Sequence, residues 1–181
     1  MTPDQLKQRF PTLTKPFKEA DLATLAGELK PASWPAGTAL TRFDERSDTL
    51  HLILSGSISI HVEKEGEDLL LGQAGAGCVV GELGLVEPGP SSATLTALED
   101  VTTLDMTHDS FEKLCKESPG TASALLRSIS QELVHRLRSS SRDILRRIDD
   151  HHWMRVRAQE DKKGWLARIA SLVRGSEGAE S

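Results

Sequence analysis

Residues 75–98 read GAGCVVGELGLVEPGPSSATLTAL, and this stretch decides the fold. The apolar run Cys78–Val80 predicts a short strand, and Ser92–Leu98 predicts a second one. Between them we expect one short helical turn at Glu82–Val86, followed by a loop through Pro88, Gly89 and Pro90. A strand, a single helical turn and a returning strand predict a compact, looped segment at the edge of a β domain.

Two glycines in this segment have a chemical consequence. Gly81 and Gly84 lack a Cβ atom, so the backbone there can turn sharply and its N–H groups can approach a ligand closely. The first turn of any helix also carries unpaired N–H donors and a partial positive charge. Backbone alone can therefore form a cradle for an anion, and Glu82 beside it can accept hydrogen bonds from a sugar hydroxyl.

Short alternating apolar runs continue on both sides of this stretch, from Ala39 onward. Each run ends at a turn signal such as Ser55-Gly56 or Glu65-Gly66. Short strands at this spacing are typical of an antiparallel barrel or jelly roll. The runs lie at 50–54, 57–62, 69–71, 78–80, 93–98 and 101–106.

Helical patterns flank the strands. Residues 17–29 place apolar side chains on one face, and the following Lys30-Pro-Ala-Ser-Trp-Pro segment ends that helix. Thr107 is expected to cap a helix over 108–116. Ser118-Pro119 predicts the start of a long helix that reaches about residue 149, roughly 45 Å in length. The fold class predicted is α+β: an antiparallel β-barrel or jelly roll flanked by helices, with a long C-terminal helix.

The segment Gly81-Glu82-Leu83-Gly84-Leu85, with Ser92-Ala93-Thr94 soon after it, resembles the phosphate-binding cassette of cyclic-nucleotide-binding domains, most of all those of bacterial catabolite activators. The resemblance covers roughly residues 20–148. It implies a cyclic nucleotide, such as cAMP or cGMP, held between the cassette and the long helix, which in that family also forms a homodimer seam. The implied ligand-binding residues are Gly81, Glu82, Leu83, Gly84, Ser91, Ser92, Arg136, Ser140 and Ser141.

The chain departs from the family at one position. The residue before the Ser-Ala pair is an arginine that holds the cyclic phosphate in the family, and here it is Ser91. Removing the charged partner of a buried pair costs about 2–5 kcal/mol. Residues 65–126 also carry eleven Asp and Glu against two Lys, so a replacing cation has to come from the long helix, Arg42 or Arg46. The alternative is a cassette that remains as a structural turn in a ligand-free scaffold protein.

A second alternative rests on arginines of the long helix. Arg138, Arg142 and Arg146 are four residues apart and so share one helical face. Guanidinium planes stack on guanine and bind phosphates in a bidentate way, so this face is a candidate site for cyclic di-GMP. A solvated face paired with acids such as Asp143 explains the same spacing.

Apolar patterns in the long helix and in the tail indicate which proteins this chain contacts. Leu126, Leu133, Leu137, Ser140 and Ile144 recur at the spacing of a helix that packs against its own copy, so a homodimer through 119–149 is expected. The amphipathic, basic segment 151–174 is a candidate for docking a partner protein, and folding back onto its own domain is the alternative. We divide the chain into an N-terminal extension at 1–19, the domain at 20–149 and a tail at 150–181.

Other function classes lack a supporting pattern. The tail is too short for the winged helix-turn-helix of the catabolite activators, so no DNA-binding domain is expected. His51 and His61 are interpreted as barrel-surface histidines because the ligand spacing of a metal-binding cupin is missing. No catalytic residues, and hence no enzyme activity, are predicted. Cys78 and Cys115 lie far apart, and no apolar span approaches membrane length, so we expect a soluble, cytoplasmic protein with reduced thiols.

Overall fold

The computed structural model describes residues 1–64 and 66–140. The chain divides into two compact units, 1–131 and 132–181. The first unit contains every strand found among the described residues, and the second is helical over its described part, 132–140. This division differs from the expected boundaries at 20 and 149, because residues 1–19 belong to the same compact unit as the strands.

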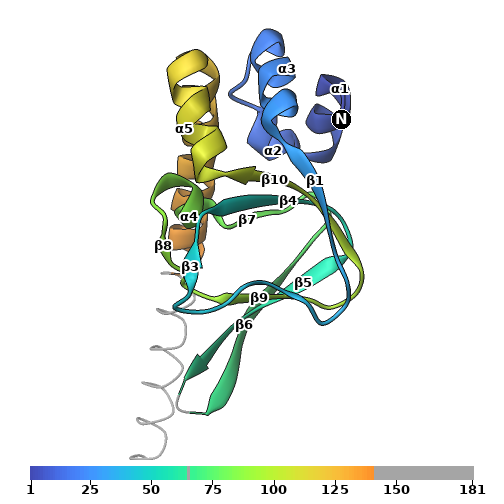
Figure 1. Cartoon of the computed structure of the whole chain (residues 1–181), viewed down its shortest axis with the longest axis vertical. Coiled ribbons are helices and arrows are strands. Elements are labelled where there is room, and N and C mark those ends of the chain that lie inside the picture. Colours follow the sequence, from blue (N-terminus) through green and yellow to red (C-terminus); the bar gives the residue numbers. More distant parts are fainter. Residues whose placement is uncertain (65, 141–181) are drawn as a thin grey trace, which may run out of the picture. The chain divides into compact units, whose positions relative to one another are not determined.

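Two four-stranded antiparallel sheets form the jelly roll that the turn signals predicted (Figure 1). The first sheet has the order β1 (Lys30–Trp34), β10 (Val101–Thr107), β4 (Thr49–Ser55) and β7 (Val79–Val80). The second has the order β2 (Ala39–Thr41), β9 (Thr94–Ala97), β5 (Ser57–Lys64) and β6 (Glu67–Gly75). A small third sheet pairs β3 (Arg46–Ser47) with β8 (Gly89–Pro90).

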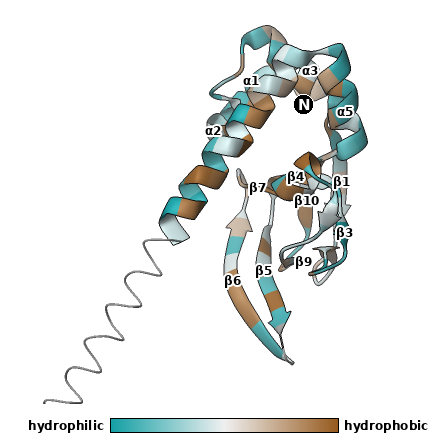
Figure 2. Ribbon diagram, turned by 90° about the vertical axis from the view of Figure 1, so that its left-hand side faces the viewer, coloured by the Kyte–Doolittle hydropathy of each residue, from teal (hydrophilic) through white to brown (hydrophobic). Residues whose placement is uncertain are grey.

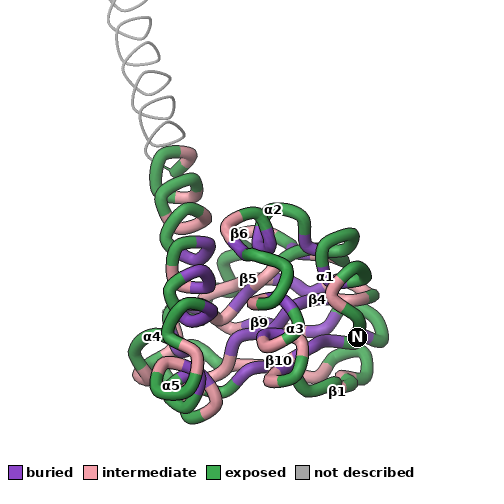
Figure 3. Tube along the Cα trace, turned by 90° about the horizontal axis from the view of Figure 1, so that it is seen from above, coloured by how far each residue is buried: buried purple, intermediate pink, exposed green. Residues whose placement is uncertain are grey.

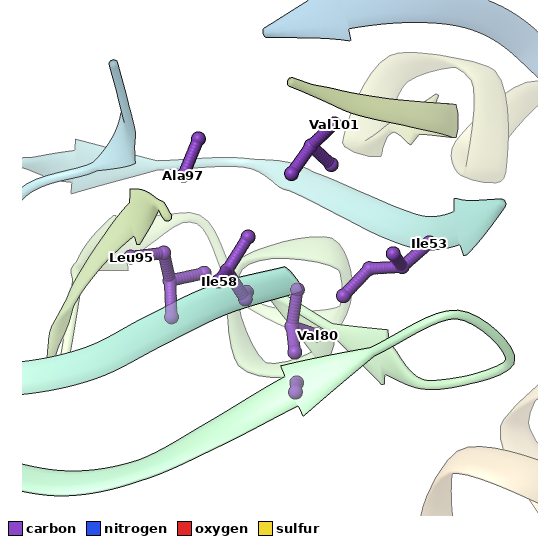
Figure 4. Packing of buried hydrophobic residues seen from close by; sticks show 7 residues of the cluster. Ile53, Ile58, Val80, Leu95, Ala97 and Val101 are labelled. Atoms are coloured by element: carbon purple, nitrogen blue, oxygen red, sulfur yellow. The ribbon is translucent and has the colours of Figure 1, made fainter. Parts of the chain in front are cut away.

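The main core lies between the two large sheets (Figure 4). Ile53 and Val101 come from the first sheet, and Ile58 and Leu95 come from the second. Because side chains alternate along a strand, the face of β4 that carries Ile53 also carries His51. The interior of the jelly roll is therefore apolar at one end of β4 and carries a histidine nearer the other.

The opposite face of the first sheet is also buried, beneath the helices that Figure 1 shows above it. Leu50 and Leu52 are each 1% exposed, and they alternate with the inward-facing residues of β4. Burial on both faces explains why β4 reads as a nearly continuous apolar run, and Figure 3 shows buried positions along β4 and β10. The helices of this unit include α1 (Pro3–Arg9), α2 (Pro11–Thr14), α3 (Glu19–Glu28), α4 (Glu82–Val86) and α5 (His108–Glu117), and residues 119–131 are helical as well.

Most predicted elements are present. The helical turn of the cassette has the expected bounds, and Thr107 caps α5 by accepting a hydrogen bond from the Ser110 backbone N–H. Helix begins again at residue 119, as Ser118-Pro119 predicted, while its expected end near 149 lies outside the described residues. The short strands β1, β2, β3 and β8 and the helices α1 and α2 were not predicted.

The hairpin of β5 and β6 extends away from the rest of the jelly roll (Figure 2). Its second strand is longer than the predicted run at 69–71, and Leu69, Leu70 and Leu71 are all more than half exposed. The sequence signal for this strand was correct, although these leucines lie on the surface rather than in the core.

Candidate functional site

The cassette is built where β7 ends and α4 begins. Gly81 is the N-cap of α4 and has left-handed backbone angles, φ 80° and ψ 16°, which glycine adopts without a Cβ penalty. No side chain caps this helix. The left-handed turn and the lack of a side-chain cap are compatible with an anion cradle, which stays a prediction at this position.

The two cassette glycines rest on the backbone that joins β3 to β4. A Cβ atom on Gly81 would overlap the carbonyl oxygen of Thr49, and one on Gly84 would lie 2.8 Å from the carbonyl oxygen of Ser47. Both glycines are therefore explained by a close contact, as the sequence predicted. The contact is with the protein's own backbone rather than with a ligand. This packing fixes α4 against the end of β4.

The other predicted cassette residues divide by exposure. Glu82 is 8% exposed and Gly84 is also buried, whereas Leu83 and Ser92 are exposed. The structure thus brings Gly81, Glu82, Leu83 and Gly84 together in one turn.

Ser91, the residue in the arginine position, is bound into the neighbouring loop. Its Oγ donates to the carbonyl oxygen of Ala93 at 2.7 Å, and its backbone N–H donates to the carbonyl oxygen of Glu45 at 2.8 Å. The Asp44 N–H in turn donates to the Ser91 carbonyl oxygen at 2.9 Å. The position that holds a phosphate in the family here stabilises the chain segment 42–46.

Comparisons with known proteins agree with this geometry. The family model described as cyclic nucleotide-binding domain matches residues 31–118. Residues 31–118 therefore resemble a cyclic nucleotide-binding domain. The cassette lies within the matched residues. The description of this family model names a binding domain and no catalytic activity.

Three relatives show the range of proteins that carry a similar domain. A CRP-like cAMP-activated global transcriptional regulator of Mycobacterium tuberculosis is 28% identical over 62% of this chain and 50% of its own length. A cyclic nucleotide-binding domain from Methylobacillus flagellatus has 21% identity and a TM-score of 0.71, covering 79% of this chain and 84% of that one. A c-di-GMP responsive global regulator of Xanthomonas campestris has 25% identity and a TM-score of 0.60, covering 69% and 62%. The chain therefore spans about half the length of the first of these relatives.

The predicted helix residues lie in the second unit, 132–181. Arg136 forms an ion pair with Glu132 at 3.4 Å, while Arg138 and Ser140 are exposed. Ser141, Arg142 and Arg146 lie outside the described residues. A site shared by the cassette and these helix residues stays a prediction.

The candidate replacement cations lie beside Ser91 along the chain segment 42–46. Arg42 is largely exposed and its Nη1 lies 3.9 Å from Oε2 of Glu45, a separation that provides little stabilisation at the surface. Arg46 lies in β3, paired with Pro90 of β8. Both arginines line a cavity whose walls contain none of residues 81–92.

His51 contradicts the interpretation of a surface histidine. It is 2% exposed, and its Nδ1 lies 2.9 Å from Oδ1 of Asp105. Trp34 contacts the ring edge-on, with centroids 5.6 Å apart. One signal for this pair was present in the sequence: His51 and Asp105 are the titratable residues within the apolar runs 50–54 and 101–106.

The described residues contain neither a metal-binding cluster nor a membrane-spanning helix. Within 1–64 and 66–140, no group of three or more His, Cys, Asp or Glu side chains has the arrangement of a metal site. No helix in this same part of the chain has the length and apolar character needed to cross a bilayer. The two thiols are free, and burial, together with the nearby Glu112 carboxylate, raises the pKa of Cys115 above its usual value.

Proposed function

We propose that this domain is the sensing part of a regulatory protein and that it binds a cyclic nucleotide or a related ligand at the cassette. The ligand contacts would come from Gly81, Glu82, Leu83, Gly84 and Ser92, with Arg136, Ser140 and Ser141 of the long helix completing the site. The long helix would form a homodimer, and segment 151–174 would report the ligand to a partner protein. A ligand changes that output only by binding two positions of the helix unequally.

The observation that carries this proposal is the cassette turn itself. Its left-handed Gly81, the uncapped first turn of α4 and the buried Glu82 occur together inside a domain that matches the cyclic nucleotide-binding family. The Mycobacterium tuberculosis relative is cAMP-activated, which makes cAMP the first ligand to test.

Ser91 favours a second candidate function. Because its hydroxyl and both of its backbone polar groups already bond within the protein, the cassette can serve as a structural turn with no ligand at all. In that case the chain would be a dimeric scaffold that retains the barrel. The third possibility is a cyclic di-GMP receptor that uses Arg138, Arg142 and Arg146, and the similarity to the Xanthomonas campestris regulator is the reason to include that ligand in the test.

The substitution Ser91→Arg tests whether the pocket lacks only its phosphate anchor. A ligand that binds only the folded state raises the melting temperature, so we would measure thermal unfolding with cAMP, cGMP and cyclic di-GMP. Restoring a buried charge pair is worth about 2–5 kcal/mol, so we expect Ser91→Arg to bind a cyclic mononucleotide about 30-fold or more tighter than the native chain.

Ser33→Arg is the matched control, because it adds the same charge at an exposed position of β1. Ser33→Arg should respond as the native chain does. If neither the native chain nor Ser91→Arg responds to any of the three nucleotides, the sensing proposal is wrong and the scaffold is favoured. A native response to cyclic di-GMP alone would instead direct mutagenesis to Arg138.

A further inference from the structure

A cavity of about 390 Å³ opens inside the first unit, and none of residues 81–92 lines it. Strand β1 supplies its apolar and aromatic wall, including Ala32 and Trp34, while β4 and β10 contribute polar side chains, among them His51 and Asp105. The segment 42–48 supplies its other wall. Pockets for small ligands typically measure about 300–1,000 Å³, so this cavity is at the small end of that range.

A buried and incompletely bonded histidine lines this cavity. His51 donates from Nδ1 to the Asp105 carboxylate, which as an anion only accepts hydrogen bonds. In the neutral ring that arrangement leaves a lone pair on Nε2, and this buried atom has no hydrogen-bond partner among the described residues. An unpartnered buried polar atom is costly, so a group that donates a hydrogen bond to Nε2 would be stabilised there. Because Nε2 has less than 1 Å² of exposed surface, this contact requires the imidazole ring to turn toward the cavity.

The charges around the cavity are of both signs. Three cationic side chains and three carboxylates line it. A ligand with one kind of charge would meet repulsion from half of them, whereas a molecule with separate positive and negative groups would match the wall. The six residues are Lys30, Arg42, Arg46, Glu45, Asp48 and Asp105.

The wall of the cavity also supports the cassette. Ser47 and Thr49 line the cavity, and their backbone carbonyls are the groups on which Gly84 and Gly81 rest. Glu45, a third lining residue, accepts the hydrogen bond from the Ser91 N–H. Both ends of the cassette therefore contact residues that a molecule in the cavity would touch.

We propose that this cavity is a second ligand site, for a small zwitterion of the size and chemistry of a free amino acid. The ammonium group donates to Nε2 of His51 beside the Asp105 carboxylate, and Trp34 covers its apolar part. The carboxylate of the ligand lies against Arg42 and Arg46. This site is separate from the cassette, and the shared wall gives it a route to influence the cassette.

The test is direct binding of single L-amino acids to the full chain, followed by NMR at the ring nitrogens of His51 and the indole N–H of Trp34. This readout does not depend on any cassette ligand, so failure here is distinct from failure of the proposed function. We expect at least one amino acid to shift both signals saturably, where the same concentration of sodium chloride does not. Silence of both signals across the whole panel overturns the proposal.

Two variants and a control locate the binding. Ala32→Leu fills the cavity and leaves the His51–Asp105 pair intact, so binding should be lost. His51→Gln removes the Nε2 acceptor and should weaken binding about tenfold or more. His61→Gln changes a histidine of β5 that does not line the cavity, so binding should be unchanged. If Ala32→Leu binds as tightly as the native chain, the amino acid binds elsewhere and the proposal is wrong.

Discussion

At the scale of single residues, the cassette glycines are explained by steric contact with the protein itself. Gly81 combines a left-handed φ of 80° with a neighbour that excludes any Cβ atom, the carbonyl of Thr49. Gly37 has nearly the same φ, 79°, but nothing lies within 4 Å of where its Cβ would be. A side chain at Gly37 would therefore strain only the backbone conformation, whereas one at Gly81 would also clash with a neighbouring backbone atom.

Replacing each of these glycines by alanine should give unequal losses of stability. Gly37→Ala introduces only the left-handed penalty, about 1–2 kcal/mol. Gly81→Ala adds a clash with backbone, which typically costs about 1–3 kcal/mol more and also displaces α4. Urea denaturation of both variants measures the difference in the free energy of unfolding, and equal losses would contradict the packing of Gly81 on Thr49.

Ser91 is likewise explained by contacts within the protein itself. The resemblance implied an arginine at this position, and the structure instead shows a serine whose hydroxyl bonds locally to the Ala93 carbonyl. The hydrogen bonds from residue 91 to the segment 42–46 come from its backbone, so an arginine at this position could keep them.

At the scale of elements, the N-terminal helices are joined to the helix that starts at residue 119. The Oγ of Ser128 donates to the carbonyl oxygen of Leu13, a buried hydrogen bond between positions 115 residues apart. Thr121 donates to Asp21 of α3 at 3.0 Å. Residues 1–19 are therefore part of the compact unit and hold the base of that helix.

Ser128→Ala should destabilise this junction. It leaves the buried Leu13 carbonyl without its partner, at a cost of about 1–3 kcal/mol. Ser130→Ala is the matched control, since Ser130 is exposed on the same helix and alanine has the higher helix propensity, by up to about 0.5 kcal/mol. Chemical denaturation compares the two variants, and a loss of the same size in both would show that the hydrogen bond contributes nothing.

The elements that sequence patterns missed have physical explanations. Thr2 and Gln5 form a capping box around Pro3 at the start of α1, a signal that was present in the sequence but is weak in so short and polar a helix. Strand β1 contains Pro31, which argues against a central strand, and β1 indeed lies at the edge of its sheet beside β10. Its pairing with β10 could be seen only in the folded structure.

At the scale of the whole molecule, the proposed dimer depends on the helix beyond the barrel. Val134 and Leu137 are exposed, with Leu137 at 69%. Leu137→Glu should convert a dimer to a monomer, because it places a charge in an apolar seam. Sedimentation velocity measures the change, with Gln131→Glu as a control that adds the same charge elsewhere on the exposed helix surface. A native chain that is itself monomeric would contradict the dimer.

The sequence by itself determined the features that depend on neighbours along the chain. Alternation of apolar residues, turn signals and the Thr107 cap specified the jelly roll and α5, and the run from Gly81 to Leu85 specified the cassette turn. These patterns act over a few residues, so each could be recognised without knowing what packs against it.

Only the tertiary structure decided what surrounds the cassette. The pairing of His51 with Asp105 joins residues 54 positions apart, and the contact of Gly81 with Thr49 depends on how α4 packs against β4. Local patterns do not encode such contacts, because they arise from strand order and register across the two sheets. For this reason the sequence predicted a surface histidine where the folded protein has a buried one.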